Sequence, residues 1–116
     1  MADIPNTRFI NFVDTPATIK YNQSGDARVN LDPQTGGVID LSGFRRANVL
    51  IGSTTASSFL VAIGKISGAT LAQGNNEPID SKVHTYDVVG PQLTLSLMGG
   101  PPNTREKVQL WVYLSS

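Results

Sequence analysis

The side chains best suited to acid–base or nucleophilic chemistry are few in this sequence and stand far apart. His84 is the only histidine, whereas a catalytic triad or a histidine-containing metal site needs a nucleophile or further ligands beside it. In the segment KVHTYDVV, strand alternation places His84 on one face with Tyr86 and turns Asp87 to the other face. We therefore expect His84 to be a surface or hydrogen-bonded residue and not a catalytic one.

The carboxylates are scattered and mostly lie in or beside predicted turns. Those weighed for a catalytic role are Asp26, Asp32, Asp40, Glu77, Asp80, Asp87 and Glu106. Paired-carboxylate hydrolysis needs two such groups about 5 to 10 Å apart in a cleft, and no local spacing creates that pair. The segments GDARVNLD and GNNEPID could supply oxygens to a calcium ion, although neither has EF-hand spacing. Turn formation is the favoured role. We expect no enzymatic activity, no cofactor and no metal, with calcium as the weaker alternative.

Two other kinds of chemistry are excluded by residue type. A Walker A loop requires Ser or Thr directly after its lysine, but Ile66 follows Lys65 in the segment IGKISGAT. The chain contains no cysteine, which excludes disulfides, thiolate catalysis and cysteine-ligated zinc.

Charge and hydropathy argue against nucleic acids and membranes as partners. Nine basic and nine acidic residues cancel, so there is no basic excess to neutralise nucleic-acid phosphates or to bind anionic lipid. No apolar run approaches the roughly 20 residues of a membrane helix, and the first residues lack the pattern of a secretory signal. We expect a soluble protein with no membrane insertion, while its compartment stays unknown. Low net charge also permits self-association, because identical copies repel one another weakly.

Short runs rich in Val, Ile, Leu, Thr, Phe and Tyr alternate with Gly, Pro, Asn and Ser clusters, which is typical of strands joined by turns. Strands are predicted at 8–13, 17–22, 27–31, 37–41, 46–52, 58–65, 82–89, 92–98 and 107–114. Helical spacing is weak everywhere, and the best helical candidate, 67–74, is bounded by glycines.

Many short strands at close spacing predict an all-β fold, specifically an antiparallel two-sheet β-sandwich of jelly-roll character with about 8–9 strands. At 116 residues, the chain fits one domain spanning residues 1–116. Residues 1–15 are expected to form an N-terminal arm or an edge strand of that domain.

The last two predicted strands each have a clear aliphatic face. We expect 92–98 and 107–114 to form a hairpin, although the loop between them is long for one. Its inner surface would consist of Leu93, Leu95, Leu97, Val108, Leu110 and Val112.

The opposite face of the last strand carries the only tryptophan, Trp111, together with Tyr113 and Gln109. With Tyr86, these residues form a candidate recognition surface, since aromatic rings stack on sugars and are enriched at protein interfaces. Three explanations stay open: cover by the protein's own chain, cover by a second subunit, or a ligand platform.

The N-terminal segment RFINFV supports the first two explanations. Phe9 and Phe12, with Ile10 and Val13, place apolar groups on both faces of a terminal strand. Such a strand must be covered on both sides, in its own fold or in a neighbour's.

The segment GGVIDLSGFRRANVLIG resembles a turn common in jelly-roll carbohydrate-binding modules and related galactose-binding-like sandwiches. In that turn, an apolar-Asp-Leu-Ser-Gly-aromatic phrase, here Ile39 to Phe44, leads into a buried strand, here Val49 to Ile51. The C-terminal VQLWVYL similarly resembles the closing strand of such domains. The resemblance implies a jelly-roll sandwich and adds a sugar-binding hypothesis, but it contains no binding residue.

The sequence therefore predicts a non-enzymatic structural or interaction module that self-assembles into a homo-oligomer. A virion or phage surface component, or another extracellular assembly, would fit this description. The alternative is a lectin-like carbohydrate-binding module with an aromatic platform. A glycosidase is the third and weakest hypothesis.

Overall fold

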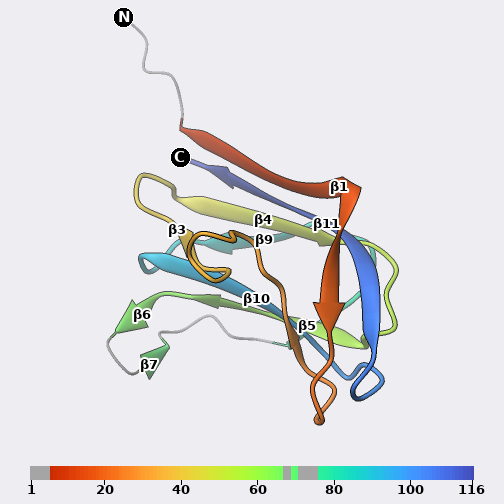
Figure 1. Ribbon diagram of the computed structural model, residues 1–116. Coiled ribbons are helices and arrows are strands. Elements are labelled where there is room, and N and C mark those ends of the chain that lie inside the picture. The colour runs from red at the N-terminus through yellow and green to blue at the C-terminus, as the bar shows by residue number, and fades with distance from the viewer. Residues whose placement is uncertain (1–5, 67–68, 71–75) are drawn as a thin grey trace, which may run out of the picture.

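The computed structural model describes residues 6–66, 69–70 and 76–116, and these residues form strands and loops with no helix among them. Two antiparallel sheets face each other, as Figure 1 shows. Sheet A consists of β1 (Thr7–Lys20), β11 (Arg105–Ser115), β4 (Arg46–Ile51) and β9 (His84–Asp87), in that order. Sheet B consists of β2 (Ala27–Arg28), β10 (Gln92–Met98), β5 (Ser58–Ile63) and β8 (Asn76–Pro78), and β3 (Ile39–Asp40) also pairs with β10. A separate pair is formed by β6 (Lys65–Ile66) and β7 (Ala69–Thr70).

The connections between strands repeatedly cross from one sheet to the other. The chain passes from β1 to β2, from β4 to β5, from β9 to β10 and from β10 to β11, and each step changes sheet. The resulting orders, β1-β11-β4-β9 and β2-β10-β5-β8, are those of a jelly roll. Within the described residues, four strands in sheet A and five in sheet B confirm the predicted all-β sandwich.

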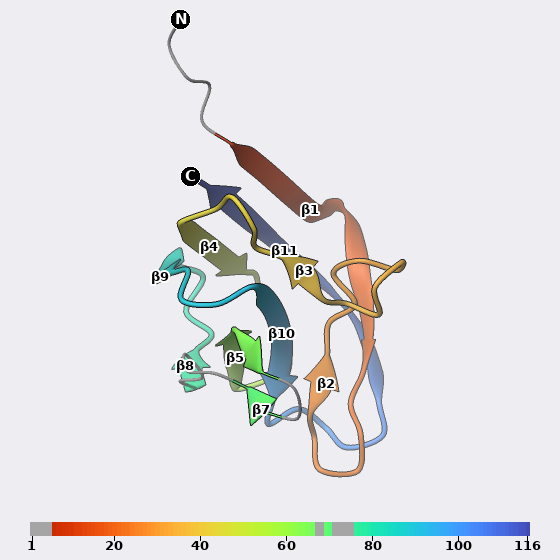
Figure 2. The ribbon, with the colours of Figure 1, turned by 90° about the vertical axis from the view of Figure 1, so that its left-hand side faces the viewer.

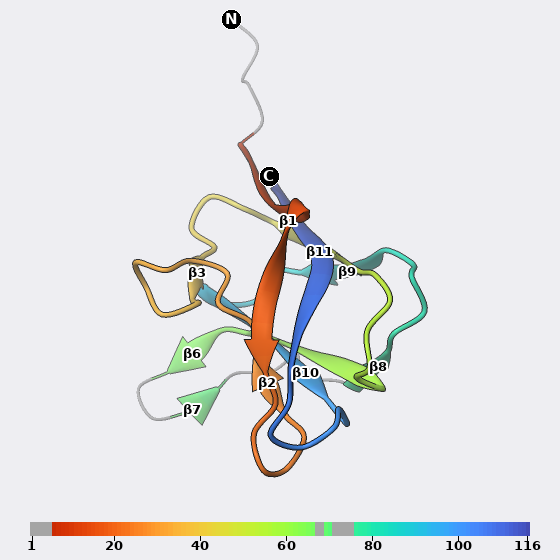
Figure 3. The ribbon, with the colours of Figure 1, turned by 45° about the vertical axis from the view of Figure 1, so that its right-hand side comes forward.

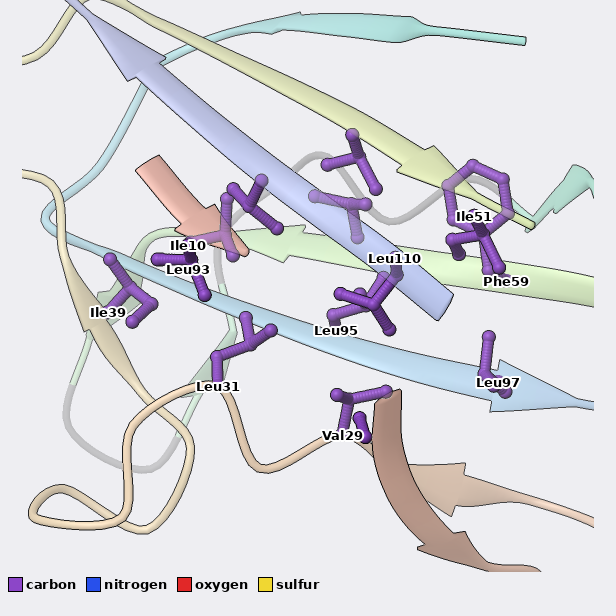
Figure 4. Packing of buried hydrophobic residues seen from close by; sticks show 14 of the residues in the cluster. Ile10, Val29, Leu31, Ile39, Ile51, Phe59, Leu93, Leu95, Leu97 and Leu110 are labelled. Carbon is purple, nitrogen blue, oxygen red and sulfur yellow. The ribbon is translucent and has the colours of Figure 1, made fainter. Parts of the chain in front are cut away.

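The core lies between the sheets and is built from the predicted aliphatic faces. Strand β10 alternates buried and half-buried residues along its whole length, because successive side chains of a strand point to opposite faces. The six residues predicted to face inward are all buried: Leu93, Leu95, Leu97, Val108, Leu110 and Val112. Figure 4 shows side chains of β10 meeting those of β11 and β4 between the ribbons. Burial of each such side chain contributes about 1.5–3 kcal/mol.

The predicted hairpin of 92–98 with 107–114 is wrong. Strand β10 pairs with β5, β2 and β3 in sheet B, whereas β11 pairs with β1 and β4 in sheet A. The two aliphatic faces therefore meet across the core and not side by side, as the edge-on view in Figure 2 shows. Alternation identifies the buried face of a strand but does not identify its hydrogen-bonded neighbour.

The predicted strands 8–13 and 17–22 are one long strand, β1. It pairs with β11 from Thr7 opposite Ser115 to Lys20 opposite Arg105, and the register shifts between Phe12 and Ala17. This bulge bends β1 sharply (Figure 1), and its second half continues beside β11 (Figure 3). Residues 7–20 thus form an edge strand of sheet A.

Two segments have a different secondary structure from the one predicted. Part of the segment GNNEP, predicted to be a turn, forms the edge strand β8 at Asn76–Pro78. An edge strand tolerates proline because one side of its backbone needs no partner. In the helical candidate 67–74, Ala69 and Thr70 belong to strand β7, and the other residues lie outside the described part.

The DLSGF turn leads into β4 as expected. The carboxylate of Asp40 accepts a hydrogen bond from the Ser42 amide at 2.9 Å, and the Phe44 amide donates to the Leu41 carbonyl at 3.0 Å. Gly43 has a φ of +85°, which favours glycine. The hydrogen bond from the Ser42 amide, and then the interaction with the Ser42 side chain, lower the pKa of the Asp40 carboxyl.

Candidate interaction surface

The outer face of sheet A carries the aromatic side chains. Inward residues of β11 alternate with Gln109, Trp111 and Tyr113, which point away from the core. The register places Phe9 of β1 opposite Tyr113 and Leu50 of β4 opposite Trp111. Facing residues of paired strands project to the same side of a sheet. The sheet therefore gathers apolar side chains from three strands that are distant in sequence.

Phe9, Trp111 and Tyr113 form what we call the aromatic patch. The Phe9 ring lies edge-on to Trp111 with 6.0 Å between centroids, and edge-on to Tyr113 with 6.1 Å. This is the preferred geometry for aromatic pairs. Phe9 is 54% exposed and Tyr113 is 38% exposed. The three rings line a hollow of about 460 Å³ that is open to solvent.

A second hollow shares Trp111 with the first. Its volume is about 280 Å³, and it is lined by Val13, Leu50, Gly52, Gln109, Leu110 and Trp111. A Cβ at Gly52 would approach the Gln109 carbonyl oxygen to 3.2 Å, so a side chain fits tightly there. Leu50 is a residue of this surface that was not predicted from the sequence. The sequence feature that indicates it is the position of Leu50 between the buried residues Val49 and Ile51. Strand alternation then directs the Leu50 side chain to the outer face.

The polar side chains beside the patch already have partners in the protein. Gln109 donates its amide to the Val13 carbonyl at 3.0 Å. Asn48 donates to the Tyr113 carbonyl at 3.2 Å, and its amide oxygen accepts from the Thr85 hydroxyl at 2.7 Å. The outer face of sheet A thus combines exposed apolar rings with satisfied polar groups.

Two residues predicted for this surface lie elsewhere. Tyr86 pairs with Ala47, which is fully buried, and its ring faces the core from β9. Phe12 is partly buried and packs against the core beside the bulge of β1. Of the six predicted residues, the structure therefore brings together four: Phe9, Gln109, Trp111 and Tyr113.

The free edge of β1 is poorly suited to pairing with another strand. At the bulge, the Val13 amide donates to the Asn11 side chain at 2.9 Å and is no longer available. Pro16 lies within the same irregular stretch and has no amide hydrogen. Bulges and prolines are common devices that block edge-to-edge association. Contacts with a partner are therefore better accommodated on the face of sheet A than along this edge.

His84 belongs to a polar cluster at the opposite edge of the sandwich. Its Nε2 lies 2.9 Å from Asp80 Oδ1, and its Nδ1 lies 3.5 Å from Glu77 Oε2 on β8. Its ring packs edge-on against Phe59 of the core at 5.1 Å. The hydrogen bond from His84 lowers the pKa of Asp80. His84 thus links β9 of sheet A to β8 of sheet B.

Tyr86 lies beside this cluster with an unusual hydroxyl. Among the described residues, it is the one buried side-chain polar atom without a hydrogen-bond partner. Burial, and then the nearby Glu77 carboxylate, raise the pKa of Tyr86 to about 12.

The carboxylate of Glu106 on β11 accepts hydrogen bonds from three hydroxyl groups. The buried Tyr21 hydroxyl and the Thr54 hydroxyl donate to its Oε1, and the Thr55 hydroxyl donates to the same atom at 2.8 Å. Partial burial acts to raise the pKa of Glu106, but these hydrogen bonds outweigh it and the pKa is lowered. Glu106 therefore fastens the loop after β4 to β1 and β11.

The remaining hypotheses on chemistry concern metals, phosphate and membranes. In the described part of the chain, no three His, Asp or Glu side chains are grouped so that they could hold a metal ion such as calcium. Lys65 begins strand β6 directly after Gly64, whereas a phosphate-binding loop would open a helix there. Among the described residues, no helix has the length and apolar character needed to cross a bilayer.

Comparisons with known proteins bear on the fold. No protein-family model and no curated protein sequence matches the chain. The crystal structure of the infectious bursal disease virus VP2 subviral particle aligns with 98% of this chain and 33% of that chain, at a TM-score of 0.49 and 12% identity. The crystal structure of the SPBc2 prophage-derived protein YomS aligns with 100% of this chain and 98% of that chain, at a TM-score of 0.60 and 16% identity. The likeness to YomS shows that the two chains share an all-β fold.

Proposed function

We propose that this protein is a non-enzymatic structural module that self-assembles through the outer face of sheet A. The observation that carries the proposal is the aromatic patch, in which Phe9 is 54% exposed while the neighbouring amides of Gln109 and Asn48 are bonded within the protein. Large exposed aromatic side chains beside an apolar hollow are typical of protein interfaces.

A second copy of the same chain is the partner that the charges favour. The formal net charge is zero, so two copies approach without net repulsion. On the outer face of sheet A, Arg46 of β4 lies opposite Asp87 of β9, so this margin carries both signs of charge. A two-fold contact that uses the same patch twice is the commonest symmetry of homo-oligomers.

A contact of ordinary size would cover only part of the molecular surface. Specific interfaces bury about 800 Å² on each partner, and the exposed surface of this chain is 6817 Å². The protruding Phe9 ring and the hollow beside Trp111 give the face both a knob and a recess. In a two-fold pair, the knob of each copy would fill the recess of the other.

The setting that we propose is the surface of a virion or phage particle, or another extracellular assembly. The shared fold with a prophage-derived protein supports this setting. The non-enzymatic part of the proposal rests on the sequence, in which no nucleophile–base pair or phosphate-binding loop is recognised.

A lectin-like role for the aromatic patch is less well supported. Sugar hydroxyls require hydrogen-bonding groups beside the stacking ring. The amides of Gln109 and Asn48 would be those groups, but both are already engaged with backbone carbonyls.

Sedimentation velocity over a range of concentrations tests the self-assembly proposal. The wild-type protein is expected to show a weight-average sedimentation coefficient that rises with concentration, and Phe9→Ser is expected to remove the rise. Val89→Ser is the matched control, because Val89 is 53% exposed and lies outside the patch. A wild-type protein that stays monomeric at the highest attainable concentration would disprove the proposal.

A further inference from the structure

The outer face of sheet B differs in character from that of sheet A. Gln92, Thr94 and Ser96 alternate with buried leucines along β10 and point outward, where they are half-buried. Arg28 of β2 lies opposite Ser96, and Ala62 of β5 lies opposite Thr94. The middle of this face is therefore a row of amide and hydroxyl groups, with the Arg28 guanidinium on one side and Leu60 and Ala62 of β5 on the other.

These residues line a groove. One hollow of about 200 Å³ is bounded by Arg28, Val38, Ala62, Gly64, Gln92, Thr94 and Ser96. An adjoining hollow of about 400 Å³ is bounded by Thr35, Val38, Asp40, Pro91 and Gln92. Val38 and Gln92 line both hollows, so the two lie next to each other. From Gln92 to Ser96 the groove follows four residue steps of β10, or about 13 Å.

The polar groups of this groove have few partners in the protein. Within residues 6–66, 69–70 and 76–116, the side chains of Arg28, Gln92, Thr94 and Ser96 make no hydrogen bond or ion pair, in contrast to Gln109 and Asn48 on sheet A. Asp40 is partly engaged within the protein, since its Oδ1 accepts from the Ser42 amide and its side chain also interacts with Ser42. Half-buried polar groups without partners are suited to a polar ligand, because they lose little on exchanging water for it.

We propose that this groove binds a neutral oligosaccharide. Its lining offers a guanidinium and an amide as donors, a carboxylate as acceptor, and two hydroxyls that can donate or accept. A ligand that carries many hydroxyl groups, each of which both donates and accepts, matches this mixture. Val38 and Ala62 supply apolar contacts for the C–H faces of a sugar ring.

Other polar polymers fit the groove less well. An extended peptide gains affinity by adding a strand to a sheet edge, whereas this groove lies on a sheet face whose central strand β10 is paired on both sides. Among the lining side chains that the structure describes, Arg28 is the one cation and Asp40 balances it, so these residues do not supply the basic excess that a nucleic acid requires.

The test uses a panel of neutral di- and trisaccharides built from glucose, galactose, mannose, xylose and N-acetylglucosamine, followed by ¹H–¹⁵N spectra of the full chain. At least one member is expected to shift the amide signals of residues 92–96 and of Arg28 at millimolar concentration. The double variant Thr94→Val with Ser96→Ala is expected to lower the association constant roughly tenfold or more, since it removes two hydrogen-bonding hydroxyls.

Two controls separate this site from the aromatic patch and from general effects. Thr18→Val removes an exposed hydroxyl from β1, and Trp111→Ala removes the centre of the patch, so both are expected to leave the association constant unchanged. The thermal unfolding midpoint of each variant reports whether it is folded. Absence of shifts across the whole panel would overturn the proposal, and so would binding that is lost in Trp111→Ala but kept in the double variant. Failure of self-assembly would leave this proposal untouched, because it rests on the opposite sheet.

Discussion

Phe9 and Trp111 lie edge-on on the outer face of sheet A, with 6.0 Å between ring centroids and an interplanar angle of 64°. They are 102 positions apart in the sequence and meet because β1 pairs with β11. The contact leaves Phe9 54% exposed, which is more than a packing role requires. In the proposed assembly, a second copy of the chain would bury this exposed part of the ring.

The fluorescence of Trp111 is expected to report self-assembly directly. Trp111 is the only tryptophan, so emission on selective excitation comes from the patch alone. The emission maximum is expected to move to shorter wavelength as protein concentration rises, because water leaves the indole, and this dependence is expected to vanish in Phe9→Ser. An emission maximum that is independent of concentration in the wild-type protein would argue against burial of the patch.

Replacement of Glu106 by Gln is expected to lower the free energy of unfolding by about 1–3 kcal/mol at neutral pH. The change removes the charged acceptor shared by Tyr21, Thr54 and Thr55, and the Tyr21 hydroxyl is part of a fully buried residue. Denaturant unfolding of the wild type and the variant at pH 7 measures this difference.

The free energies of unfolding of the wild type and of Glu106→Gln are expected to converge at acidic pH. The pKa of Glu106 is lower in the folded protein than in the unfolded chain. The stabilisation that the Glu106 carboxylate provides is therefore complete above the pKa that Glu106 has in the unfolded chain. It is lost as the pH falls through the lower pKa that Glu106 has in the folded protein. A difference between wild type and Glu106→Gln that stays constant from pH 7 to strongly acidic pH would show that the charge of Glu106 is not responsible.

Tyr86→Phe is expected to leave the stability unchanged or to raise it by up to about 1 kcal/mol. In the described part of the chain, the Tyr86 hydroxyl is buried without a hydrogen-bond partner, so its removal relieves a desolvation penalty. Thermal unfolding measures the change. In a spectrophotometric titration, the tyrosine that ionises at about pH 12 in the wild type is expected to be missing from the variant. A clear loss of stability would mean that the hydroxyl has a partner.

Gly100→Ala is expected to destabilise the fold by about 1–3 kcal/mol or more. A side chain at this position would come within 2.2 Å of the Tyr21 ring, which is fully buried and cannot move aside. Gly36→Ala is the comparison: it has open space around it but a φ of +70°, so only backbone strain of about 1–2 kcal/mol opposes it. If both variants unfold at the same denaturant concentration, the packing of Gly100 against Tyr21 is not the cause.

Residue alternation predicted much of the core correctly. The leucines of 92–98 and the aliphatic residues of 107–114 are buried as expected, because side-chain direction along a strand has a period of two. The same rule predicted an outward Trp111 and Tyr113. It also puts Phe12 on the inward face with Ile10, and there Phe12 packs against the core and not in the aromatic patch.

Strand pairing could not be predicted in the same way. The segments 92–98 and 107–114 have the local features of neighbouring strands, yet they lie in opposite sheets. Each has another partner that is more distant in sequence, such as β5 for β10 and β1 for β11. These pairings depend on how the whole chain closes its core, which no local window contains. Edge strand β8 was missed for a related reason, because its contact with β5 compensates for poor strand propensity.

The sequence by itself determined the all-β class, the buried faces of the main strands, and the presence of aromatic residues on the outward side of the last strand. These properties follow from side-chain type and spacing along a few residues. The tertiary structure alone decided that Phe9 joins Trp111 and Tyr113, that Tyr86 faces the core, and that a polar groove crosses sheet B. Each of these depends on which strands lie side by side, and that is set by long-range pairing.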